Sequence, residues 1–121
     1  PNRFVIRLAR QITGRKYVLV MNWCYHGTVD ETFATITADG VGPRRGNMGP
    51  PVNPKETTRV VEFNDLKALE EALKDKQVAC VLAEPAMTNI GIIHPDAGYH
   101  KALRDLTRKY GTLLVIDETH T

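Results

Sequence analysis

Short apolar runs that do not alternate with polar residues constrain the fold of this chain most. Three such runs occur, at residues 17–21, 78–83 and 113–116. Strands of a parallel sheet, buried on both faces, have this continuous apolar character. Neighbouring parallel strands also need long crossover connections, and amphipathic helical patterns lie between these runs. The sequence therefore predicts an α/β architecture, a mostly parallel sheet with helices on both faces.

The helical segments are marked by apolar residues three and four positions apart. One helix is expected from Asn2 to Gly14, a second after a cap at Asn64 or Asp65, and a third ending at Gly111. Their apolar positions are Val5, Leu8, Ala9 and Ile12; Leu66, Leu69, Ala72 and Leu73; and Tyr99, Leu103, Leu106 and Tyr110. A further short strand is predicted at residues 59–63, whereas residues 30–37 suit helix or extended chain equally.

Residues 38–54 contain four glycines and four prolines, a density that favours a long loop without regular structure. Loops longer than ~12 to 15 residues in compact domains are often binding loops or interface segments. Arg44, Arg45 and Asn47 offer donors for a carboxylate there. We therefore expect this loop near a subunit interface or a pocket entrance, and solvation of both arginines is the competing interpretation.

The composition fits part of one globular domain rather than a disordered or membrane-spanning chain. The 121 residues carry a net charge of +2, too small to indicate a nucleic-acid or membrane partner. No apolar run approaches the ~20 residues that span a bilayer. The two cysteines, Cys24 and Cys80, form no disulfide framework and are interpreted as structural thiols in a reducing, cytoplasmic setting. The helix that begins at residue 2 suggests that the chain is part of a larger domain, truncated at both ends.

Chemically capable side chains follow each of the three apolar runs. The carboxyl ends of parallel strands meet at one edge of a sheet, where such folds bind ligands. Tyr25 and His26 follow the first run, Glu84 the second, and Asp117 and Thr119 the third. Each residue alone also has a structural interpretation, as a core aromatic, a satisfied histidine or the end of a strand. Their expected convergence indicates a binding crevice, and the scattered histidines predict no metal site.

Four segments in this order resemble one enzyme family. They are NRFVIRLARQITGR at 2–15, YHG at 25–27, EPAMTNIG at 84–91 and YGTLLVIDE at 110–118. With these segments the chain resembles the large domain of the class III pyridoxal-phosphate-dependent aminotransferases, which have fold type I and include glutamate-1-semialdehyde aminomutase. The resemblance extends over almost the whole chain and implies pyridoxal 5'-phosphate as the cofactor.

The resemblance also implies roles for the candidate residues. Tyr25 would stack on the pyridine ring of the cofactor, and Asp117 would pair with the ring nitrogen and keep it protonated. Glu84 would lie on the reactive side of the cofactor, and His26 would support the orientation of Tyr25. Thr119 stands where the family commonly has a valine that packs on the opposite face of the ring, and its hydroxyl needs a partner.

The whole protein would then transfer an amino group between an amine or amino acid and a keto acid, or act as an aminomutase. The family implies a homodimer, with no nucleic-acid or membrane partner. Its phosphate-binding residues would precede Asn2, and its Schiff-base lysine would follow Thr121. We therefore expect the 121-residue fragment to be inactive by itself.

Two alternatives remain open from the sequence. The chain could be a binding or scaffold domain that kept the fold without the chemistry. The stretch LLVIDETH at 113–120 is also similar to the metal-binding strand of DExH-type nucleotide hydrolases. That class requires a phosphate loop, and the nearest candidate, at residues 14–17, lacks the required glycine spacing and the hydroxyl after the lysine.

Overall fold

A computed structural model describes residues 1–45 and 53–121 of the chain. Its main sheet has four parallel strands in the order β4-β1-β5-β6. The strands are β1 (Tyr17–Met21), β4 (Thr58–Val61), β5 (Val78–Ala83) and β6 (Leu113–Ile116). The predicted bounds of β1, β5 and β6 are confirmed, and the fourth strand lies slightly earlier than the predicted residues 59–63.

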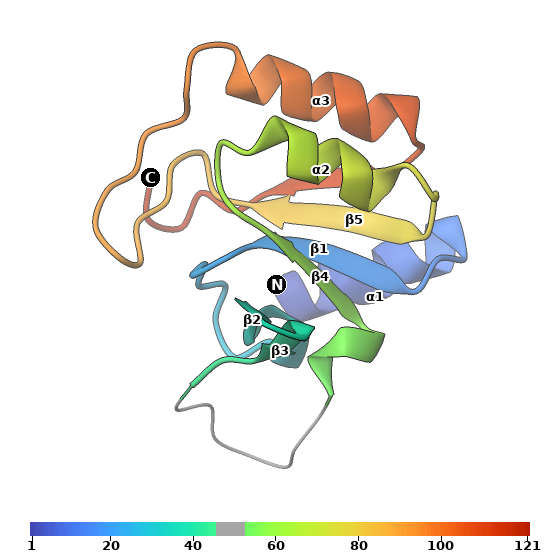
Figure 1. The fold of residues 1–121 in the computed structure, drawn as a ribbon. Helices are drawn as coiled ribbons and strands as arrows, with labels where there is room; N and C mark the ends of the chain where they lie inside the picture. The colour runs from blue at the N-terminus through green and yellow to red at the C-terminus, as the bar shows by residue number, and fades with distance from the viewer. Residues whose placement is uncertain (46–52) are drawn as a thin grey trace.

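Three helices cover the two faces of this sheet (Figure 1). They are α1 (Asn2–Thr13), α2 (Leu66–Leu73) and α3 (Tyr99–Lys109). The helices α2 and α3 lie side by side on one face, and α1 packs against β5 from the other face. This arrangement confirms the predicted α/β architecture, because each helix buries at least two residues of one side against the sheet or a neighbouring helix.

The helix ends follow the residues expected from the sequence. Gly14 ends α1 with a left-handed backbone, at φ 67°, and its N–H donates to Arg10 O. Asp65 caps α2, since its side chain accepts a hydrogen bond from Ala68 N. Gly111 has φ 66° just beyond α3. All three predicted helices are therefore confirmed.

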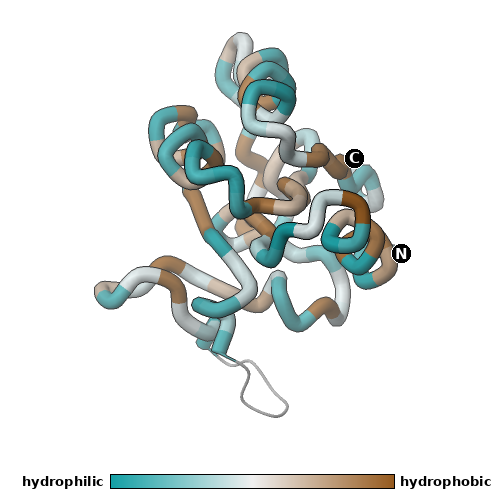
Figure 2. The backbone as a smooth tube through the Cα atoms, turned by 90° about the vertical axis from the view of Figure 1, so that its right-hand side faces the viewer, coloured by the Kyte–Doolittle hydropathy of each residue, from teal (hydrophilic) through white to brown (hydrophobic). Residues whose placement is uncertain are grey.

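The core lies between the two helical layers and is centred on β1 and β5. Every residue of β5 and residues 18–21 of β1 are buried. Ile6 and Ala9 of α1 pack against them from one face, and Leu69, Leu73 and Leu103 from the other. In Figure 2 the tube changes between teal, hydrophilic residues and brown, apolar residues along its helices, as expected where only one side of a helix packs on the core. The positions at the carboxyl ends of β1 and β5 are fixed by this packing.

One part of the predicted loop is wrong. Residues 34–43 form a two-stranded antiparallel hairpin, β2 (Ala34–Thr37) and β3 (Gly40–Pro43), within a region expected to lack regular structure after residue 38. Glycine density misled the prediction because Gly40, at φ 101°, and Gly42 sit inside the paired strand rather than breaking it. Short 3-10 turns, η1 (Asp30–Thr32) and η2 (Pro54–Glu56), flank the hairpin region. Asn47 lies outside the described residues.

Two surfaces are less buried than the apolar pattern predicts. The strand β6 lies at an edge of the sheet, and Leu113 and Ile116 are each 37% exposed. On α1, the apolar residues Leu8 and Ile12 face away from the sheet and are 60% and 71% exposed. Among the described residues, no helix has the length and apolar character needed to cross a membrane.

Candidate functional site

A cleft of about 460 Å³ lies at the carboxyl ends of β1 and β6. The start of α1 forms one wall, the segment after β1 forms the second, and the segment after β6 forms the third. The lining residues are Pro1, Asn2, Val5, Tyr25, His26, Gly27, Val115, Ile116, Asp117, Glu118, Thr119 and His120. Four of the five predicted site residues therefore line one cleft, as the parallel sheet requires.

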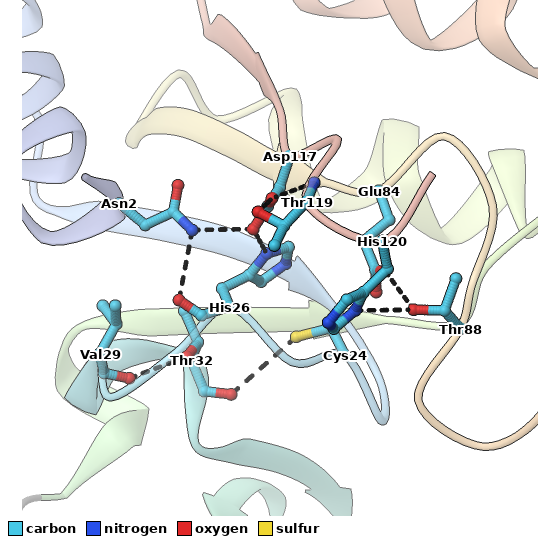
Figure 3. Close-up of polar contacts among 10 residues, drawn as sticks. All are labelled: Asn2, Cys24, His26, Val29, Thr32, Glu84, Thr88, Asp117, Thr119 and His120. Atoms are coloured by element: carbon cyan, nitrogen blue, oxygen red, sulfur yellow. Dashed lines mark hydrogen bonds and ion pairs between the residues drawn. The ribbon is translucent and has the colours of Figure 1, made fainter.

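The carboxylate of Asp117 is the most heavily hydrogen-bonded group in this cleft (Figure 3). Its Oδ2 accepts hydrogen bonds from His26 Nδ1 and Asn2 Nδ2, each at 2.8 Å. Its Oδ1 accepts from Thr119 N at 3.1 Å and from the Thr119 hydroxyl at 2.7 Å. The backbone N–H of Asp117 donates to Ala83 O at 2.7 Å, which extends the pairing of β5 with β6 and fixes the start of this segment.

These contacts keep Asp117 ionised. Burial by itself raises the pKa of the carboxyl group. The hydrogen bonds from His26, Thr119 and Asn2 outweigh burial and hold the pKa well below its usual value. A carboxylate that stays negative at the wall of a cleft is suited to bind a cation or a protonated heterocycle.

His26 is bonded to Asp117 through its ring. Its side chain is completely buried, and the ionised partner means that Nδ1 carries the proton in this bond. The backbone carbonyl of His26 accepts from Asn2 Nδ2 at 3.2 Å, so the same amide also reaches the chain beside the ring. His26 thus contacts the carboxylate directly, in addition to following Tyr25 in sequence. Within the described residues its buried Nε2 has no hydrogen-bond partner.

Tyr25 supplies the aromatic surface of the cleft. Its side chain is 43% exposed and lines the cleft together with Asp117. Two residues before Tyr25, Trp23 adopts φ 67°, so the chain turns sharply after β1 before it reaches Tyr25. An exposed aromatic ring and an ionised carboxylate in one cleft, beside the apolar Val5 and Val115, fit a flat cationic heteroaromatic molecule.

Glu84 is placed differently from the other four predicted residues. It follows β5, is only 3% exposed, and does not line the cleft. Its Oε2 accepts from the Thr88 hydroxyl at 2.6 Å, and Thr88 in turn contacts His120 Nδ1 at 3.3 Å. His120 lines the cleft, so these two hydrogen bonds connect Glu84 to the cleft, as Figure 3 shows. Its Oε1 is buried and, among the described residues, has no partner.

The predicted arginines and cysteines lie outside the cleft. Arg44 Nη2 donates a long hydrogen bond to Thr32 O at 3.5 Å, so this side chain is partly held by the protein, whereas Arg45 is exposed. Both cysteines are free and buried, and burial raises the pKa of Cys24 and of Cys80 to about 11. Neither thiol is therefore an effective nucleophile at neutral pH.

Asn2 is the site residue that the sequence did not reveal. It is 115 positions from Asp117 and was expected only as the first residue of a helix. An asparagine at the start of a helix does not indicate a functional site, because asparagine is common there for capping alone. The contact arises from the fold: α1 begins against the edge where β1 and β6 end.

The chain is similar to known proteins over nearly its whole length. The model of the family described as "Aminotransferase class-III" matches residues 2–121. A glutamate-1-semialdehyde 2,1-aminomutase of Sulfurihydrogenibium azorense is 43% identical over 121 residues, which cover 96% of this chain and 28% of that protein. The chain thus spans little more than a quarter of the length of that curated relative.

Solved structures extend the comparison. A glutamate-1-semialdehyde-aminomutase variant from Pseudomonas aeruginosa PAO1, in complex with PMP, is 52% identical with a TM-score of 0.94, and the match covers 99% of this chain and 27% of that one. The ornithine aminotransferase of Toxoplasma gondii, with partial occupancy of PLP at its active site, is 28% identical with a TM-score of 0.81 over 99% of this chain and 29% of that one.

Proposed function

Because the chain belongs to the class-III aminotransferase family, we propose that the protein containing it is a pyridoxal-phosphate-dependent enzyme that moves amino groups. It transfers an amino group between an amine or amino acid and a keto acid, or returns it to the same carbon skeleton as an aminomutase. The observation that carries this proposal is the cleft in which the ionised Asp117 and the exposed ring of Tyr25 lie together.

The residues of the cleft fit the cofactor. Asp117 is the partner for the pyridine nitrogen, and Tyr25 is the aromatic surface for the ring. Thr119 and Val115 would bound the ring from the β6 side. The first turn of α1 lies at the cleft, where the partial positive charge of a helix start favours a phosphate group. When bound, the protonated pyridine ring withdraws the electrons released at the substrate carbon.

The chain's own groups prepare that chemistry. Asp117 stays negative and stabilises a proton on the ring nitrogen. His26 and Asn2 hold Asp117 Oδ2 from the buried side, so that the carboxylate keeps its orientation. Glu84 is buried near the cleft and linked to it through Thr88 and His120, which suits a role in positioning water or substrate.

An aminomutase reaction is the more specific proposal. Identity to the aminomutases is 43% and 52%, compared with 28% for the ornithine aminotransferase. We also propose that residues 1–121 are part of one large cofactor-binding domain, that the protein is a homodimer, and that it acts in the cytoplasm. A reducing compartment is consistent with its two free, buried thiols.

The test uses the full-length protein. Purified protein is expected to absorb visible light from bound pyridoxal phosphate, or to acquire that absorbance when the cofactor is added. It is then incubated with glutamate 1-semialdehyde alone, and separately with amino donors plus keto acids. Isomerisation without a second substrate identifies an aminomutase, and exchange between two substrates identifies a transaminase. A colourless protein that takes up no cofactor contradicts the proposal.

A further inference from the structure

The acceptor capacity of Asp117 is completely used by its own chain. An ionised carboxylate offers about four acceptor positions. Oδ2 accepts from His26 Nδ1 and Asn2 Nδ2, and Oδ1 accepts from the backbone N–H and the hydroxyl of Thr119. A further donor that enters the cleft and seeks Asp117 must therefore replace one of these four.

The four donors differ in how easily they can leave. The His26 ring is completely buried, and the Asn2 amide is also bonded to His26 O at 3.2 Å. The Thr119 N–H belongs to the backbone, so its removal requires the chain to move. The Thr119 hydroxyl turns away by rotation about a single bond, and Thr119 is exposed, so water can satisfy the released group.

We propose that the hydroxyl of Thr119 is a displaceable donor, which occupies Asp117 Oδ1 in the cofactor-free protein and yields to the ring N–H of a bound pyridine. This inference rests on the proposed function and assigns a positioning role to one side chain. The hydroxyl stabilises the cofactor-free form, because it satisfies Asp117 there. It consequently weakens the binding of any cofactor whose ring nitrogen uses the same oxygen.

A substitution that removes the hydroxyl and keeps the shape reveals this competition. In Thr119→Val the Oδ1 atom keeps only the backbone donor, and the protonated ring meets no competing hydroxyl. We expect pyridoxamine 5'-phosphate to bind about three- to tenfold more tightly, the net size of one typical hydrogen bond. Thr119→Ser keeps the hydroxyl and is expected to bind as the wild type does.

The experiment measures dissociation constants by calorimetry on cofactor-free, full-length wild type, Thr119→Val and Thr119→Ser. Two probes are compared: pyridoxamine 5'-phosphate, and its deaza analogue, in which a C–H replaces the ring nitrogen. If the valine side chain only packs better on the ring, the dissociation constants of both probes decrease equally. Displacement of the hydroxyl predicts tighter binding of the pyridine probe only, because the analogue has no N–H for Asp117.

A second measurement is independent of binding. The pKa of Asp117, followed by carboxyl-carbon NMR in the cofactor-free protein, is expected to rise in Thr119→Val and to stay in place in Thr119→Ser. Equal effects on both probes, or an unchanged Asp117 pKa in Thr119→Val, overturn the inference and leave the proposed function intact. Wild-type protein that binds neither probe overturns both.

Discussion

At the scale of single residues, the site depends on the groups that hold Asp117 as much as on Asp117 itself. Three other residues donate to its two oxygens, and they come from α1, from the segment after β1 and from the segment after β6. A preorganised arrangement of this kind keeps a charge in place without reorganisation when a ligand arrives. Removing the charge of Asp117, or one of the side chains that donate to it, should therefore have a measurable effect.

Replacing Asp117 with Asn tests the charge. The amide keeps the size of the side chain and no longer favours a proton on the ring nitrogen. We expect the full-length variant to bind cofactor in part and to carry out the amino-transfer half-reaction ~100-fold more slowly, the loss typical of one preorganised electrostatic partner. Stopped-flow absorbance measures this rate, with Asp39→Asn, an exposed carboxylate on the hairpin turn, as the matched control. An unchanged rate would assign Asp117 a structural role.

Acidification tests the same group in the cofactor-free protein. The pKa of Asp117 is lowered from 3.8 by folding, so its ionised form stabilises the folded state above that pH. The contribution is lost as the pH falls through the lower, folded-state pKa. We expect the difference in unfolding free energy between wild type and Asp117→Asn to be constant between about pH 5 and about pH 7. It is expected to shrink below about pH 4. Urea unfolding at a series of pH values measures it, and a difference that grows on acidification contradicts the assignment.

Asn2 provides a further test at this scale. Replacing it with Ala removes two hydrogen bonds, one to Asp117 and one to His26 O. A loss of about 1 to 3 kcal/mol in the unfolding free energy is expected, because Asp117 is charged and partly buried. The pKa of Asp117 is expected to rise in the same variant. Replacing Arg7, which is exposed on the same helix, with Ala serves as the control, and equal effects of the two changes would remove Asn2 from the site.

At the scale of elements, the residues that end and cap helices were predictable because their effect is local. Asp65 supplies an oxygen to the first turn of α2, and Gly14 adopts the left-handed conformation that ends α1. The hairpin β2–β3 was not predictable in this way, since its pairing joins Ala34 to Pro43 and outweighs the breakers inside it. The contact of Asn2 with Asp117 was missed for a related reason: it depends on how α1 meets the sheet edge.

The cap of α2 gives a local prediction. Asp65→Ala leaves Ala68 N without its acceptor and is expected to cost about 1 kcal/mol in local stability. Hydrogen exchange of the first-turn amides of α2 is expected to accelerate about fivefold, with Lys67→Ala, on the exposed side of the same turn, as the control. Equal exchange in the two variants would show that the cap contributes nothing.

At the scale of the whole molecule, the segment predicted as a loop, residues 38–54, bears on how subunits assemble, although part of it forms β3. Arg44 is partly held by Thr32 O, and Arg45 is exposed. We expect the full-length protein to sediment as a dimer, and the double change Arg44→Ala with Arg45→Ala to weaken the dimer or the affinity for the carboxylate of the amino acceptor. An active monomer, or a double variant unchanged in both properties, would separate this loop from function.

The outer side of α1 has a consequence for handling the isolated chain. Phe4, Leu8 and Ile12, one turn apart, are 69%, 60% and 71% exposed and form a continuous apolar strip along the helix. Water in contact with such a strip is released when two copies associate through it. The 121-residue chain in dilute buffer is therefore expected to aggregate. We expect the turbidity of the solution to increase with ammonium sulfate and with warming, and to decrease in Leu8→Glu.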